Sequence, residues 1–343
     1  MTAPAGTRRI VATIDDCLGP GEDRYFGAGF RRVRHRLEAI QVSRRPDSTE
    51  ATARASVTYP AHWSAKGTGQ LVPHLSSIDS LALVAQLAEI LLGQAYGLDA
   101  GARSRMWLRA VHLRAGVHPQ EDLDHIPVHG VVRPAESTHV ADGLLASSLH
   151  TRIGSMEVRC DIQHEAAGGY RPGRAGARHR SAEDVLGEPH RRYFADLFRH
   201  RDQQVTHLIV DRDAGRVDAT VHITPAPGES HLRPTGLESA YLPSASMIDA
   251  ITVTGQLAQV LLYEIDGIDR GDSDTLWLRK AALSTRMPLR TLEHPFSAHV
   301  RIEDSRLLII ADDTWRVCDF GYAFHGITGG FSVAHRLPDQ GPR

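Results

Sequence analysis

The chain has 343 residues, of which 41% are hydrophobic and 23% charged, and a formal net charge of -2. Its length predicts two domains, and its composition is typical of a folded globular protein, which excludes a disordered or fibrous chain. The near-neutral charge does not concentrate polyanions, so we expect no nucleic-acid partner.

The first patterned segment along the chain, residues 15–31, recurs at residues 183–199. Aligned without gaps, the two copies agree at eight of seventeen positions, among them the Arg-Tyr-Phe that begins at Arg24 and at Arg192. The two arginines are candidates for binding a substrate phosphate, although ion pairs that hold the segment in place are the simpler explanation.

Two short stretches rich in β-branched residues follow in each half. Residues 38–44 and 51–60 alternate apolar and polar side chains, and residues 206–212 and 216–225 do the same. This period of two predicts a pair of strands, arranged as a hairpin, in each half.

A long apolar helix is predicted next in each half, beginning near Ser77 and Met247 and ending at Gly97 and Gly267. Apolar residues run almost all round the first of these helices, which indicates a helix buried inside the protein. Its apolar run is interrupted by polar residues, and the N-terminus lacks an apolar signal core. We therefore expect neither a membrane-spanning segment nor secretion.

Several strands are predicted after each helix, and this part of the chain is repeated as well. Residues 73–113 and 243–283 agree without gaps at sixteen of forty-one positions, and a third echo links 158–162 with 316–320. The repeated segments keep the same order in both halves, which indicates two copies of one domain fused in tandem.

The copies are expected at residues 1–170 and 183–343, joined by a linker at 171–182 that is rich in Gly, Pro and Arg. Each copy has two strands, one long apolar helix and three or four further strands. An antiparallel sheet wrapped around the helix buries both elements economically. This is the hot-dog arrangement, and the predicted fold is α+β, a double hot-dog whose two units join through their sheet edges.

Metal and disulfide sites are not indicated. Three scattered cysteines form no recognisable framework, which fits a reducing cytoplasm. The stretch 112–129, rich in His and Asp, lacks regular ligand spacing, so we expect no metal and no other cofactor.

The candidate site lies at the start of each helix, where an Asp, Asp79 or Asp249, follows a Pro by six residues. This spacing resembles that of the helix carboxylate of hot-dog 3-hydroxyacyl dehydratases, which works beside a His from the preceding loop. His62 and His231 lie 17 and 18 residues ahead of the two aspartates. Because hot-dog sites form between two units, we pair His62 with Asp249 and His231 with Asp79 as acid–base partners.

Each of these assignments has a structural alternative. An Asp next to a Ser at a helix start commonly caps the free N–H groups, and two of the 20 histidines can fall near it by chance. Gln86 and Gln256, seven residues after the aspartates on the same helix face, could orient a substrate carbonyl. A hydrogen bond inside the core explains them more simply.

The segments LGPGEDRYFGAGFRRV, SSID, QLAEILL, MWLR and CDFGYAFHGITGGF resemble the avirulence D (AvrD) family of bacterial proteins, over nearly the whole chain. The resemblance implies biosynthesis of syringolide-like acyl glycosides, diffusible elicitors or signals built from a β-ketoacyl chain and a pentulose such as xylulose. The implied joining of a β-ketoacyl chain to a small polyol is also similar to the reaction of the A-factor synthases. Those tandem hot-dog proteins join a β-ketoacyl carrier protein to dihydroxyacetone phosphate on the way to γ-butyrolactones. No catalytic residue follows from the resemblance.

We expect an enzyme that transfers a β-ketoacyl group from acyl-ACP or acyl-CoA to a small sugar or triose phosphate. Such chemistry needs a general base and an oxyanion site, and no metal or redox cofactor. A hydratase, dehydratase or thioesterase acting on the same thioesters stays an alternative. So does a non-catalytic acyl-ligand-binding protein, and a homodimer also remains open.

Overall fold

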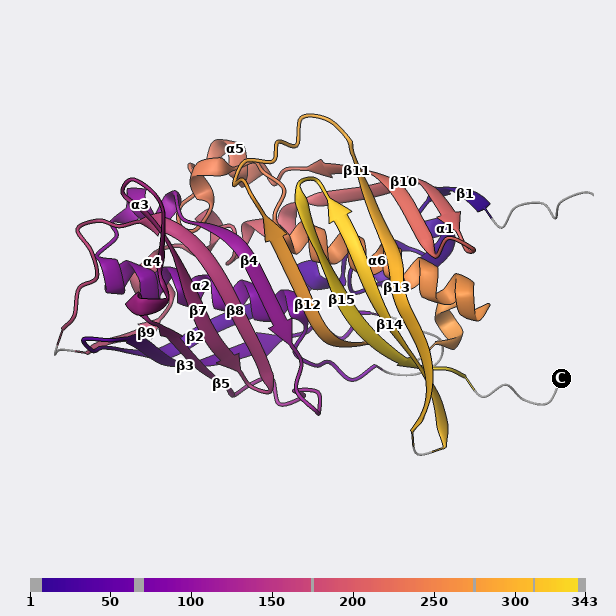
Figure 1. Ribbon diagram of the computed structural model, residues 1–343, viewed down its shortest axis with the longest axis horizontal. Coiled ribbons are helices and arrows are strands. Elements are labelled where there is room, and N and C mark those ends of the chain that lie inside the picture. The colour runs from indigo at the N-terminus through magenta and orange to yellow at the C-terminus, as the bar shows by residue number, and fades with distance from the viewer. Residues whose placement is uncertain (1–7, 65–70, 174–175, 274–275, 311, 339–343) are drawn as a thin grey trace, which may run out of the picture.

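The computed structural model describes residues 8–64, 71–173, 176–273, 276–310 and 312–338. Its strands form one 15-stranded sheet, and two helices of 20 residues each, α2 (Ser77–Tyr96) and α6 (Met247–Asp266), pack against it. In Figure 1, α2 lies behind the strands of the left-hand half and α6 behind those of the right-hand half. Each helix with its strands forms a hot-dog unit, so the predicted double hot-dog is confirmed.

In the first half two strands, the long helix and further strands follow one another as predicted, with a short strand, β1 (Arg8–Thr13), ahead of them that was not predicted. Its shorter helices are α1 (Asp15–Leu18) and α3 (Ala100–Ser104). Its other strands are β2 (Arg34–Arg44), β3 (Thr49–Thr58), β4 (Trp107–Arg114), β5 (Ile126–Val132), β6 (Thr138–Ala141), β7 (Leu144–Ile153) and β8 (Met156–Glu165).

The second half has the same main elements in the same order, but its short helix α5 (Pro227–His231) precedes the long helix, whereas α3 follows it. Its other short helix is α4 (Glu183–Leu186). Its strands are β9 (Ala177–Ser181), β10 (Asp202–Asp211), β11 (Arg216–Thr224), β12 (Trp277–Thr285), β13 (Phe296–Ile310), β14 (Asp313–Phe324) and β15 (Ile327–Arg336).

The two halves join at the centre of the sheet through β4 and β12. The strand order is β1-β10-β11-β13-β14-β15-β12-β4-β8-β7-β5-β3-β2-β9, with β6 added on β7. Across the joint, Val111 lies opposite Leu283 and Leu113 opposite Ala281. These are equivalent positions of the two copies in reverse order, so the halves meet like the subunits of a symmetric dimer.

The first strand of each copy belongs to the sheet of the other copy. β1 pairs with β10 at one end of the sheet, and β9 pairs with β2 at the other. The exchange continues past the strands, because Ile14 donates to the Val205 carbonyl (3.0 Å) and Ala182 to the Leu37 carbonyl (2.9 Å). Part of the expected linker 171–182 is therefore a strand that completes the first half. The boundaries of the two domains stay a prediction.

The long helices begin and end where the sequence indicates. Gly97 and Gly267 cap them in the left-handed conformation, with φ of 66° and 63°. α2 is long and apolar enough to span a membrane, but 89% of its most apolar window is buried inside the protein. Its hydrophobicity is therefore explained by the core.

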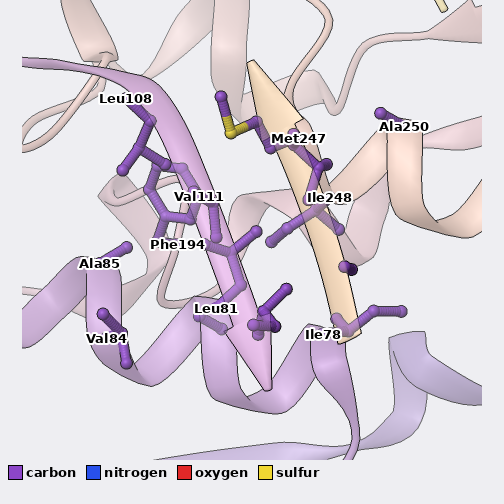
Figure 2. Close-up of a cluster of buried hydrophobic side chains, with 14 of the residues drawn as sticks. Ile78, Leu81, Val84, Ala85, Leu108, Val111, Phe194, Met247, Ile248 and Ala250 are labelled. Atoms are coloured by element: carbon purple, nitrogen blue, oxygen red, sulfur yellow. The ribbon is translucent and has the colours of Figure 1, made fainter. Parts of the chain in front are cut away.

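The apolar core is continuous between the halves. Figure 2 shows the place where the N-terminal turns of the two long helices approach β4. There Leu81, Val84 and Ala85 of α2 lie beside Leu108, Val111 and Phe194. Met247 and Ile248 of α6 complete the cluster. The start of each helix, where the candidate aspartates lie, is thus fixed at the junction of the two copies.

Candidate active site

Both long helices begin with the same capping arrangement. The Ser76 hydroxyl accepts from the Asp79 N–H (3.1 Å), while the Asp79 carboxylate accepts from the Ser76 N–H (2.9 Å). Ser246 and Asp249 repeat this arrangement at 3.2 and 2.8 Å. The capping role considered for the two aspartates is therefore present in both copies. It leaves one carboxylate oxygen free for other partners.

Asp79 has further partners that a cap alone does not need. His35 Nε2, from strand β2, lies 2.8 Å from Asp79 Oδ1. The Tyr59 hydroxyl donates to Oδ2, and the Tyr25 hydroxyl lies 3.3 Å from Oδ1 and also contacts the Ser76 hydroxyl. The side chains of His35 and Asp79 are 1% and 0% exposed. A buried His–Asp pair with two tyrosine hydroxyls thus forms at the start of α2.

The protonation state of this cluster follows from its contacts. Burial alone would raise the pKa of Asp79, but the hydrogen bonds from His35, Tyr59 and the Ser76 backbone, with the His35 charge, lower it. Burial and the Asp79 charge raise the pKa of Tyr25 and Tyr59 well above the usual value. Near neutral pH the carboxylate is ionised and the two phenols keep their protons.

A cavity of about 800 Å³ opens onto this cluster. Tyr25, Tyr59 and Ser77 lie on its wall, whereas Asp79 and His35 lie behind the tyrosines. The second copy supplies the opposite wall through residues of α6, β12, β13 and β14. Apolar surface dominates, and the cavity therefore suits a ligand with a long hydrocarbon part.

A smaller cavity of about 80 Å³ extends the apolar space into the second half. The two cavities share the lining residues Phe26, Ser77, Gln259, Leu276 and Leu278. Beyond them the smaller cavity is walled by Ala258 of α6 and by Leu283, Tyr322 and Phe331 of the sheet. The apolar space therefore runs from the start of α2 to the layer between α6 and the second half of the sheet.

At the start of α6, Asp249 has different partners from those of Asp79. Asp249 accepts hydrogen bonds from Arg201 and from Gln203 (2.6 Å), and the Tyr193 hydroxyl lies 3.3 Å away. Arg201 is buried and also binds both oxygens of Glu229, at 2.7 and 2.6 Å. Burial alone would lower the pKa of Arg201, but the charges of Asp249, Tyr193 and Glu229 raise it. This ion network is of the bidentate kind that fixes a structure rigidly.

The two sites differ in the residues that contact the helix Asp, and one difference lies at an aligned strand position. His35 in β2 and Gln203 in β10 lie 168 residues apart, the spacing of the repeat, and each contacts the helix Asp of its own copy. The first copy therefore has an ionisable ring where the second has an amide. In the first copy the ionisable ring contacts the Asp, and the two tyrosines of the same cluster lie on the wall of the large cavity.

The predicted His–Asp pairs are not formed. His62 lies on the loop after β3 with its side chain exposed, and its carbonyl accepts from Arg32 (2.8 Å). His231 is exposed at the end of α5. Among the described residues neither imidazole contacts Asp79 or Asp249. The expectation placed the His on the loop ahead of the helix, whereas Tyr59 reaches Asp79 from that direction and the His comes from β2 of the same copy.

Gln86 and Gln256 form hydrogen bonds inside the core, which was the simpler explanation for them. Gln86 donates to the carbonyls of Ala82 (3.2 Å) and Phe194 (3.3 Å), and Gln256 donates to the Thr252 carbonyl (3.1 Å). Neither lines the two cavities. Both side chains lie in the core, and Gln86 ties α2 to the repeated segment of the other copy.

The repeated arginines form the expected ion pairs, but with different partners. Arg24 contacts Asp15 of its own copy, and Arg192 contacts Glu89 on α2 of the other copy (3.4 Å). Both are 3% exposed. Arg24 also lines the large cavity, whereas Arg192 does not.

Sequence reasoning missed the groups that surround Asp79. His35 shares a strand face with buried Leu37, which was the available signal for an inward-facing imidazole. Tyr25 stands in the repeated Arg-Tyr-Phe, and Tyr59 lies near the end of the predicted strand 51–60. Among the described residues, no group of three or more His, Cys, Asp or Glu side chains could hold a metal ion.

The family model described as the Pseudomonas avirulence D protein (AvrD) matches residues 9–338. The chain belongs to the AvrD family. The resemblance read from the repeated segments is thereby confirmed. No curated protein matches the chain.

Several solved structures resemble this AvrD-family chain at low identity. The tesB protein of Mycobacterium avium subspecies paratuberculosis shares 11% identity with a TM-score of 0.40, over 84% of this chain and 93% of its own. A hot-dog protein of unknown function from Alicyclobacillus acidocaldarius shares 6% with a TM-score of 0.38, over 88% and 96%. A putative thioesterase from Novosphingobium aromaticivorans shares 9% with a TM-score of 0.33, over 86% and 98%. Similarity at this level says nothing about what the chain binds or converts.

Proposed function

We propose that the chain transfers a β-ketoacyl group from a thioester to a hydroxyl of a small sugar or triose, giving an ester that can cyclise. The observation that carries the proposal is an apolar cavity shared by both copies that has Tyr25 and Tyr59 on its wall. Behind them lies the buried Asp79–His35 pair. Membership of the AvrD family supports a biosynthetic role and a syringolide-like product.

The acyl chain would lie in the two connected cavities, with its thioester carbonyl at the start of α2. The first N–H groups of a helix lack intrahelical partners and carry partial positive charge. Ser77, the first residue of α2, brings these groups to the cavity wall. They would stabilise the negative charge that develops on the carbonyl oxygen when the acceptor attacks.

Proton transfer would pass through Tyr59. The attacking hydroxyl gives its proton to the Tyr59 oxygen while Tyr59 gives its own to the Asp79–His35 pair, with which it already shares a hydrogen bond. A carbon–oxygen bond forms and the carbon–sulfur bond breaks. The departing thiolate takes the proton back by the same route.

The first test is mass spectrometry of the protein incubated with a β-ketoacyl thioester and, separately, xylulose, xylulose phosphate or dihydroxyacetone phosphate. An enzyme-dependent acyl-polyol mass is the expected result. Free acid alone would instead indicate a thioesterase, and an enoyl product a dehydratase. Binding without any turnover would indicate a non-catalytic acyl-ligand-binding protein.

Variants of the first copy have matched controls in the second. Tyr25→Phe removes a hydroxyl from the proposed site, and Tyr193→Phe removes the equivalent hydroxyl from the ion network at α6. His35→Gln gives the first copy the residue that the second copy has. We expect His35→Gln to lower turnover by about 100-fold, the scale of acid–base catalysis, with the fold retained. Tyr25→Phe removes a hydroxyl that contacts Asp79 but carries no proton in the proposed step, so its loss should be smaller and still exceed that of Tyr193→Phe. Equal losses in Tyr25→Phe and Tyr193→Phe would contradict the assignment to the first copy.

A further inference from the structure

The charge on the wall of the large cavity is one-sided. Three arginines line it, Arg24, Arg270 and Arg279, whereas none of its described lining residues is an Asp or a Glu. Asp15, outside the cavity, offsets one of the three charges through its contact with Arg24. A mostly apolar cavity with unbalanced guanidinium groups is suited to a ligand that has both a hydrocarbon part and an anionic part.

Arg24 is incompletely paired. Its Nη2 contacts Asp15, but its Nε and Nη1 are buried without a hydrogen-bond partner among the described residues. Burial lowers its pKa, against the opposite effect of Asp15, and the nearby charge of Arg270 lowers it further. Buried N–H groups without acceptors cost free energy, which an anionic oxygen placed beside them would recover.

Arg270 is held beside Arg24 by the backbone of the first copy. It comes from the turn that follows α6, and its Nη2 donates to the Asp23 carbonyl (3.0 Å) and contacts the Ser64 hydroxyl (3.4 Å). Burial lowers the pKa of Arg270. Two half-buried or buried cations from different copies thus approach each other at one place on the wall, an arrangement that an anion between them would stabilise.

The place related to this one by the internal repeat shows which group neutralises such a pair of arginines. There Arg192, the equivalent of Arg24, and Arg103 both contact the carboxylate of Glu89, at 3.4 and 3.3 Å. The position on α6 equivalent to Glu89 is Gln259, 170 residues later, and Gln259 lines both cavities. The second copy therefore offers Arg24 an amide at the position where the first copy offers Arg192 a carboxylate.

We propose that Arg24 and Arg270 bind a phosphate group of the substrate at the place that corresponds to the Glu89 carboxylate beside Arg192. This inference rests on the proposed function for the identity of the ligand's hydrocarbon part. The phosphate could belong to a phosphopantetheine arm that carries the acyl group or to a phosphorylated sugar or triose acceptor. Both present the same oxyanion to the two guanidinium groups.

Direct binding measurements by calorimetry separate the two sources. One comparison uses an acyl-phosphopantetheine and the same acyl-pantetheine without phosphate, and the other uses xylulose 5-phosphate and xylulose. We expect the phosphorylated member of at least one pair to bind about tenfold more tightly or better. The pair that shows the preference identifies the source. Equal affinities in both pairs would overturn the inference.

Gln259→Glu is the decisive variant, because it supplies the carboxylate that the other half has at this position. We expect it to abolish the preference for phosphate and to raise the melting temperature, since Arg24 gains an internal partner. Arg270→Gln should abolish the preference as well. Gln94→Glu is the matched control, because Gln94 lies outside the two cavities and its equivalent is already Glu264.

A preference that persists unchanged in Gln259→Glu would overturn the inference. Because the readout is affinity, the result is independent of turnover. In a further outcome, the phosphate preference disappears in Gln259→Glu while the unaltered protein gives no acyl-polyol product. That result would support the anion site and contradict the proposed acyl transfer.

Discussion

His35 and Gln203 occupy equivalent positions in two copies that share a capping box. Each contacts the helix Asp of its own copy from the same strand position. A histidine can exchange a proton near neutral pH, whereas a glutamine cannot. The second copy compensates with Arg201 and Glu229, which turn the same location into a buried ion network. Besides the capping serine, the partners of the helix Asp are thus a histidine and two tyrosines in the first copy, and an arginine, a glutamine and a tyrosine in the second.

Asp79→Asn tests the charge of the first site through stability. The folded-state pKa of Asp79 lies below its unfolded value of about 3.9, so its ionised form stabilises the fold above that pH. We expect the variant to lose about 2 kcal/mol at pH 7, since hydrogen bonds to a buried carboxylate are among the stronger ones. Urea unfolding at several pH values measures this difference.

The difference between Asp79→Asn and the unaltered protein should stay constant from pH 7 to about 5. It should shrink as the pH falls below about 3.9 toward the folded-state pKa, where the unaltered protein protonates Asp79. A difference that widens with acid would show that the carboxylate is destabilised in the folded protein.

At the scale of single elements, the helices were predictable and the histidine partner was not. The apolar run and the glycines Gly97 and Gly267 mark the helix ends by local chemistry, which sequence shows directly. The partner of Asp79 depends on which strand passes the helix start, and this is a long-range property. The prediction takes its histidine, His62, from the loop ahead of the helix, because the sequence does not show that the strand with His35 passes the helix start.

The two helix ends offer a matched test of the left-handed caps. A Cβ at Gly267 would meet nothing within 4 Å, so Gly267→Ala measures backbone strain alone, and we expect a loss of about 1 kcal/mol. A Cβ at Gly97 would overlap the Arg171 guanidinium, so Gly97→Ala should cost at least as much. Thermal unfolding of the two variants compares them. No loss in Gly267→Ala would contradict the left-handed cap.

On the scale of the whole molecule, the duplication was visible in the sequence but the exchange of first strands was not. β1 and β9 are short and carry several exposed polar residues, so neither gives a strong strand pattern. Their partners β10 and β2 lie far away along the chain. No local signal tells a strand to cross to the other copy.

The exchange predicts that a cut between the copies will not separate them. A protease site inserted between residues 173 and 176 leaves β1 on the first fragment and β9 on the second, each paired with the other fragment, besides the β4–β12 joint. We expect the cleaved fragments to elute together from a sizing column in native buffer and apart in denaturant. Separate elution in native buffer would contradict the described strand pairing.

The crossed first strands also bear on the history of the chain. A deletion that removed either half would leave the survivor with a strand that has lost its partner and a sheet edge that has lost its cover. Exposed edges of this kind invite aggregation. A single half could restore both pairings only by assembling with a second copy, whereas the fused chain lets each half accumulate its own changes. In the fused chain the site at the start of α6 holds a buried ion network, while the site at the start of α2 borders a cavity.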